Sequence, residues 1–229
     1  MIRAAAIATL LLAAPSLAAE RVEIFDLAIG TPVEALPDAF VDYACGTNGG
    51  PPGRPLSGFA AFADCPADAT GLHEVYFRYD DELEYVGRAL DQAYLVEAYR
   101  GTRVEGVDAM VSVLIDDGAM LRGLRIATDP RGVLPGDRND HWRLADLLRN
   151  RFGAAAWTCT DLPPSEGETP VGTFFIKRSC EMAAQGLKLS TYQDYLHRPG
   201  QHFIDEFGKV APTYFISTSR FDMREALSP

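Results

Sequence analysis

Hydrophobic and polar residues alternate along residues 73–80, and this pattern predicts a strand with one face in the core. A period of two places successive side chains on opposite faces, so one set is expected to meet the core and the other to face outward. The inward set is His73, Val75, Phe77 and Tyr79, and the polar set is Glu74, Tyr76, Arg78 and Asp80.

A β-hairpin is predicted further along the chain. Two apolar stretches, 111–115 and 121–128, flank the sequence Asp116-Asp117-Gly118. The Asp-Gly pair is expected to supply the positive φ that a tight turn requires. Other strands are predicted at 22–27, 157–160, 173–178, 187–192 and 214–221.

Helices are predicted ahead of or between the strands. One short helix is expected to begin near Thr31, and 81–99 contains a second helical segment. A third helix, capped by Asn139 or Asp140, is expected to run to Arg151.

A helix followed by antiparallel strands, twice, predicts the fold class. We expect an α+β protein of two tandem helix-plus-antiparallel-sheet units, with helices covering one face of each sheet. The units are residues 20–130 (the first half) and 131–229 (the second half), and 128–139, with two prolines, two glycines and several charges, is the expected linker between them.

The N-terminal residues are typical of a secretory signal peptide. Arg3 precedes a short apolar run, 4–14, and small residues follow up to Ala19. The run is shorter than the roughly 20 residues that span a membrane, and a buried N-terminal helix is the alternative. Residues 1–19 are therefore expected to be removed after Ala18 or Ala19, which predicts an exported, periplasmic protein without a membrane span.

Composition narrows the class of partner. The chain of 229 residues has 21 Lys and Arg against 32 Asp and Glu, a net charge of −11, and 47% hydrophobic residues. The apolar fraction excludes a disordered chain. The negative charge argues against nucleic acid or an anionic membrane surface as the main partner.

The four cysteines fall into two pairs with nearly equal spacing. Cys45 and Cys65 are 20 residues apart, and Cys159 and Cys180 are 21 apart. Each pair encloses a Pro-Pro and is followed, after six residues, by Gly-Leu. These matches suggest an internal duplication, with coincidence in a chain rich in Pro and Gly as the alternative. A duplication predicts one disulfide per unit, Cys45–Cys65 and Cys159–Cys180, each worth roughly 3 kcal/mol. Binding of a zinc ion is the alternative role for the four cysteines, but the sequence contains no Cys-x-x-Cys.

This layout resembles the tandem fold of the β-lactamase inhibitory protein, which also has one disulfide per repeat. The run Phe25-Asp26-Leu27-Ala28-Ile29-Gly30-Thr31 is similar to a segment of an outer-membrane assembly lipoprotein, although the lipid-anchoring Cys of that family is absent. The resemblance implies architecture and carries no function.

Motifs for catalysis or cofactors are not recognisable in the sequence. There is no Gly-x-Ser-x-Gly and no His-Glu-x-x-His. The Gly-rich stretch 45–53 lacks the lysine of a phosphate-binding loop and is interpreted as a surface loop held by a disulfide, with recognition as a candidate role. We expect no cofactor and no metal.

Tyr and Arg on a rigid sheet are the residue types that interfaces favour. The leading hypothesis is therefore a non-catalytic accessory or binding protein that recognises a periplasmic protein partner, or a ligand, through a sheet face and loops. The alternatives are a secreted hydrolase with a carboxylate or Ser site, and an acidic cation-binding protein using the acidic residues at 80–84. The polar face that contains Glu74, Tyr76, Arg78 and Asp80 has another interpretation, an ordinary exposed sheet face with cross-strand ion pairs. The candidate binding residues are Tyr76, Arg78, Asp80, Arg122 and Arg125.

Overall fold

The fold is known from a computed structural model of the chain. The structure describes residues 21–79, 82–98, 100–131, 137–204, 209–212 and 215–226. The predicted signal peptide, the candidate residue Asp80 and residues 132–136 of the predicted linker lie outside these ranges.

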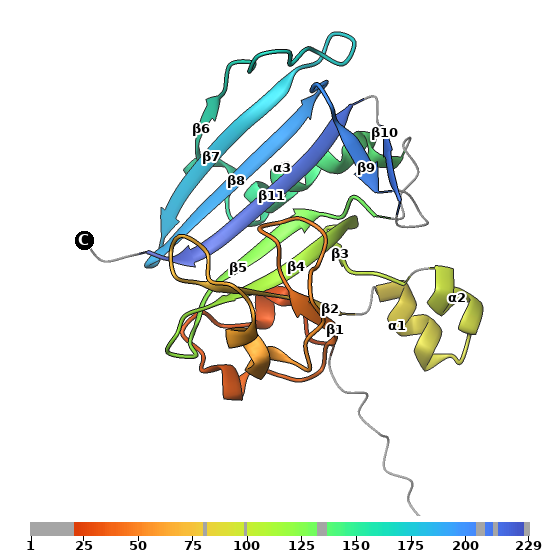
Figure 1. Ribbon diagram of the computed structural model, residues 1–229, viewed down its shortest axis with the longest axis vertical. Coiled ribbons are helices and arrows are strands. Elements are labelled where there is room, and N and C mark those ends of the chain that lie inside the picture. The colour runs from red at the N-terminus through yellow and green to blue at the C-terminus, as the bar shows by residue number, and fades with distance from the viewer. Residues whose placement is uncertain are drawn as a thin grey trace, which may run out of the picture.

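One antiparallel sheet runs through both halves of the chain (Figure 1). In the first half it contains β1 (Val41–Cys45), β2 (His73–Arg78), β4 (Val107–Ile115) and β5 (Leu121–Thr128), and β3 (Arg103–Val104) pairs with β4. In the second half it contains β6 (Thr158–Asp161), β7 (Ile176–Ala184), β8 (Leu187–Leu196) and β11 (Ile216–Glu225). The strand order is β1-β2-β4-β5-β11-β8-β7-β6, and β9 (His202–Ile204) and β10 (Val210–Pro212) form a separate ribbon.

The two halves meet at the centre of this sheet, where β5 pairs with β11. We expected a sheet in each unit, but five residue pairs between Gly123–Ala127 and Arg220–Arg224 join them into one. In both halves the first strand along the chain lies at an edge and the last lies at the centre. This order agrees with a duplication, which itself stays a prediction.

In the part of the chain that the structure describes, strands dominate the fold, with about 40% strand and 21% helix. The α-helices are α1 (Glu82–Ala89), α2 (Ala93–Ala98) and α3 (Leu144–Arg151), with α3 preceded by the 3-10 helix η4 (Asp137–Arg143). Short 3-10 turns complete the fold: η1 (Ile24–Asp26), η2 (Val33–Ala35), η3 (Phe59–Asp64) and η5 (Ala154–Ala156).

The strand predicted at 22–27 is wrong, because η1 occupies this segment. The backbone N–H of Glu23 donates to Oδ2 of Asp26 at 2.7 Å, which closes a tight turn. The turn buries Ile24 in the core. Local capping by two acidic residues therefore outweighs the apolar run that suggested a strand.

The hairpin β4–β5 is confirmed, but its turn uses a different residue from the one expected. Gly118 is not in the left-handed region, and Ala119 has the positive φ of 57°. The backbone N–H of Ala119 donates to the carbonyl of Asp116 at 2.9 Å, and the N–H of Met120 donates to Oδ1 of Asp116 at 3.0 Å. The Asp116 side chain stabilises this turn.

One hydrophobic core lies on the face of the sheet that α3 covers. Phe77, Ile126 and Phe221 are buried there from strands of both halves, and Leu144 and Leu148 are buried from α3. On the first half, η3 supplies Phe59, whose ring centroid lies 5.3 Å from that of Phe77.

Two disulfides hold the loops and the sheet edge to this core. Cys45 pairs with Cys65, and Cys159 pairs with Cys180, as the spacing predicts. The first ties the end of β1 to the residue after η3, and the second joins directly opposed residues of β6 and β7. Two disulfides are compatible with an oxidising, extracytoplasmic compartment. Among the described residues, no helix is long and apolar enough to cross a membrane.

Candidate functional site

The second face of the sheet, opposite the core, carries two of the predicted binding residues, Tyr76 and Arg125, in one transverse row. Tyr76 on β2 lies opposite Ser112 on β4, and Ser112 lies opposite Arg125 on β5. Arg125 lies opposite Asp222 on β11, which continues the row into the second half. The register therefore brings Tyr76 and Arg125 to one face, as the alternation predicts.

The expected exposure of these side chains is wrong for most of them. Tyr76 is 6% exposed, Arg78 8% and Arg125 1%. Beside Arg125 there is a covering element that the alternation could not reveal: the segment 46–58, closed by the Cys45–Cys65 disulfide, folds over this part of the face (Figure 1). The other two are buried by different neighbours, since Tyr76 packs with Ala44, Met110 and Ala127, and Arg78 pairs with Asp42 and Glu84. Their binding role stays a prediction.

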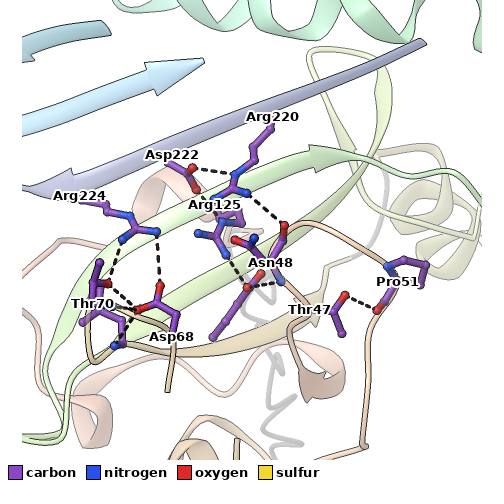
Figure 2. Close-up of polar contacts among 11 residues, drawn as sticks. Thr47, Asn48, Pro51, Asp68, Thr70, Arg125, Arg220, Asp222 and Arg224 are labelled. Atoms are coloured by element: carbon purple, nitrogen blue, oxygen red, sulfur yellow. Dashed lines mark hydrogen bonds and ion pairs between the residues drawn. The ribbon is translucent and has the colours of Figure 1, made fainter. Parts of the chain in front are cut away.

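Arg125 is the centre of a buried charged cluster (Figure 2). Its Nε donates to Oδ1 of Asp222 at 2.6 Å, and its Nη1 donates to Oε2 of Glu74. Arg220 donates from Nε to the other oxygen of Asp222 at 2.7 Å. Nη2 of Arg125 has no hydrogen-bond partner among the described residues.

The same cluster holds the covering segment down. The backbone N–H of Asn48 donates to Oε2 of Glu74 at 2.8 Å, and the carbonyl of Asn48 accepts from Nη1 of Arg220 at 3.1 Å (Figure 2). A Cβ at Gly46 would collide with the Glu74 side chain, so a glycine is needed for this close approach. The stapled segment is therefore attached through polar contacts to charges from β2 and β11.

Arg78 belongs to a separate network at the end of β2. It donates to Asp42 and to Glu84, each at 2.8 Å, and Arg88 donates to Glu84 at 2.6 Å. Burial raises the pKa of Glu84, but hydrogen bonds from Arg88, Gly101 and Arg78 outweigh it and hold the pKa below its ordinary value. These contacts fix α1 against the sheet and keep Glu84 ionised.

Arg122 lies near the start of β5, three residues before Arg125. It donates to Asp116 and to Glu225, each at 2.6 Å, and about a third of its side chain is exposed. It lines a groove of about 1070 Å³ at this end of the sheet. The groove also contains Leu72 from the first half, and Met182 and Lys188 from the β7–β8 hairpin.

The part of the second face that lies on β11, β8 and β7 is open in the described structure (Figure 1). Tyr192 on β8 is 46% exposed, and a hollow of about 290 Å³ lies beside it. Its lining includes Asp194, Thr218 and Arg220. Sequence reasoning did not select these residues, although the alternation of residues 187–196 could have placed Lys188, Tyr192 and Asp194 on one outward face.

No family model, no curated protein and no solved structure matches this chain. The resemblance of its layout to the β-lactamase inhibitory protein and to an outer-membrane assembly lipoprotein therefore remains an expectation. Function has to be inferred from the residues and contacts of this chain.

Proposed function

We propose that the protein is an exported, non-catalytic binding protein that recognises a protein partner through the open sheet face and the neighbouring loops. The observation that carries the proposal is the difference between the two faces of the second half. One face is covered by η4 and α3, which contact β11 and β8. The other presents Tyr192 and charged side chains to solvent.

The composition of the open face suits recognition of a protein. Tyr192 offers a large ring with a hydroxyl, and aromatic residues of this kind dominate the energetics of protein interfaces. Arg220 and Asp194, beside it, provide directed hydrogen bonds at the rim of the hollow. The groove that contains Arg122 extends this surface toward the loop at 70–72.

The support beneath this face is rigid. β8 forms ten residue pairs with β11 and nine with β7, and the Cys159–Cys180 disulfide ties the edge strand to β7. A rigid surface loses little conformational entropy on binding. No contact among the described residues favours the hydrolase or the cation-binding alternative, so neither is proposed.

Site-specific photocrosslinking tests the proposal. A photoreactive phenylalanine analogue replaces Tyr192 in the protein expressed in its native cell, and the matched control carries it at Tyr94. Tyr94 is 70% exposed and lies on α2, away from the open face. We expect a discrete crosslinked protein from position 192 that position 94 does not give, and its yield should fall when Thr218, an exposed residue in the lining of the same hollow, is replaced by Arg.

Two results would contradict the proposal. One is the same set of crosslinks from both positions, which would indicate random collision. The other is no crosslink from position 192 across growth conditions in which the protein is abundant and folded. Export is checked separately, since the mature chain should begin at Ala19 or Glu20 in N-terminal sequencing of the periplasmic fraction.

A further inference from the structure

A small polar pocket lies on the α3 side of the sheet, away from the open face. It has a volume of about 270 Å³ and is formed by the N-terminal segment 21–25, the end of β2, the β3–β4 turn and the last residue of α3. Its charged lining consists of Arg21, Arg103, Arg151, Glu23 and Glu105. Three guanidinium groups and two carboxylates therefore line this one pocket.

Two of these arginines lie against aromatic rings. Cζ of Arg151 is 4.4 Å from the centroid of Phe25, and Cζ of Arg21 is 5.5 Å from the centroid of Tyr79. The rings are anchored, because Tyr79 is buried and Phe25 packs edge-on against Phe152. A guanidinium on an aromatic face keeps its N–H donors in its own plane, where an anion can accept them.

The two glutamates use only part of this donor capacity. Glu23 lies 3.2 Å from Nη2 of Arg21, and Glu105 accepts from Nη1 of Arg151 at 3.0 Å. A guanidinium has five N–H donors, and each of these contacts involves one nitrogen. Nε of Arg21 is buried without a hydrogen-bond partner among the described residues. Nε of Arg103 donates to Oδ1 of Asp108 at 2.7 Å, so the donors that the pocket offers beyond these pairs belong to Arg21 and Arg151.

We propose that this pocket binds a small phosphate anion, either inorganic phosphate or the phosphate group of a small soluble molecule. The fork of a guanidinium matches two phosphate oxygens, and charge assistance makes such hydrogen bonds strong. A volume of about 270 Å³ is enough for a phosphate with a small attached group and is near the lower end of small-molecule sites. The site lies on the opposite side of the sheet from the proposed partner surface and does not depend on it.

Calorimetric titration of the purified protein with inorganic phosphate, at constant ionic strength because salt screens exposed charges, tests this site. We expect saturable binding with a Kd of about 1 mM. Arg151→Gln should weaken it about tenfold or more. Glu105→Gln should strengthen it severalfold, because it removes a carboxylate that competes for Arg151. The matched control is Arg178→Gln, which removes a partly exposed arginine of β7 that is paired with Asp161 of β6, and it should leave the Kd unchanged.

The source of the phosphate is resolved by two further titrants, glycerol 3-phosphate and vesicles containing phosphatidic acid. Binding of both soluble phosphates supports the proposal, and binding to vesicles only would overturn it in favour of a lipid headgroup. It would also be overturned if the folded protein showed no saturable phosphate binding. An equal loss in Arg151→Gln and Arg178→Gln would have the same consequence. Circular dichroism of each variant shows that it is folded.

Discussion

Arg125 of β5 donates from Nε to Oδ1 of Asp222 of β11, and this hydrogen bond of 2.6 Å joins the two halves where their central strands pair. Both side chains are buried on the face opposite the core. Glu74 accepts from the same guanidinium and also from Asn48, so the bridge extends to the stapled segment 46–58. The junction of the halves and the attachment of that segment therefore share one set of charges.

Removing one partner of this buried cluster should destabilise the protein strongly. Asp222→Asn removes the carboxylate that Arg125 and Arg220 share and leaves Glu74 to compensate the two guanidinium groups, and breaking a buried pair typically costs about 3–5 kcal/mol. Urea unfolding followed by circular dichroism measures the change in the free energy of unfolding. Arg178→Gln, which breaks a more exposed ion pair with Asp161, should change stability little. Equal stabilities of the two variants would show that the cluster does not join the halves.

The close approach of β5 and β11 should be sensitive to a single methyl group at Gly123. A Cβ there would lie 2.7 Å from the carbonyl oxygen of Met223, closer than real Cβ contacts come. Gly123→Ala should therefore cost about 1–3 kcal/mol, in the range of overpacked interiors. Gly101→Ala is the control, because a Cβ at Gly101 meets nothing within 4 Å. A Gly123→Ala protein as stable as the control would contradict the tight junction.

Most strands, the hairpin and the cysteine pairing could be predicted from the sequence. The strands follow from the local alternation of hydrophobic and polar residues, and the disulfides follow from the spacing of the cysteines. The sequence also predicted a common face for Tyr76 and Arg125, since alternation decides which side a strand residue takes. It did not predict that this face is covered, because the covering depends on contacts between Asn48 and charges 26 and 172 residues away. The periodicity of hydrophobic residues also could not show that β5 pairs with β11, because it does not determine which of several strands far apart in the sequence become neighbours.

Each disulfide should stabilise the protein by a similar amount but protect a different region. In the chain-entropy model a loop of about 20 residues is worth roughly 3 kcal/mol, so Cys45→Ala/Cys65→Ala and Cys159→Ala/Cys180→Ala should both lower stability by about that much. Hydrogen exchange should separate them. The first variant should lose protection at 46–58, and the second at β6 and its pairing with β7. If both variants lost protection in the same region, the prediction that the two disulfides stabilise different regions would be wrong.

Protonated His73 should stabilise the fold, and its contribution should disappear as the pH rises. Nδ1 of His73 lies 2.6 Å from the carbonyl of Cys65 and must donate to it, and Nε2 lies 3.0 Å from Oδ1 of Asp117. Only the protonated ring can donate to both. The hydrogen bond to Asp117 is the main cause that raises the pKa of His73 above its ordinary value of 6.5, although burial opposes it.

When folding raises the pKa of a group, the protonated group stabilises the folded protein. This contribution is complete at pH values below the pKa in the unfolded chain, and it is lost as the pH rises through the higher pKa in the folded protein. Asp117→Asn should therefore be less stable than the parent protein below about pH 6.5, and the difference should shrink as the pH rises above that value. Urea unfolding across this range gives the difference, and an NMR titration of the His73 ring should show its pKa falling in the variant. His73→Gln should lack this pH-dependent contribution. A stability gap that widened at higher pH would show that His73 acts as a neutral ring.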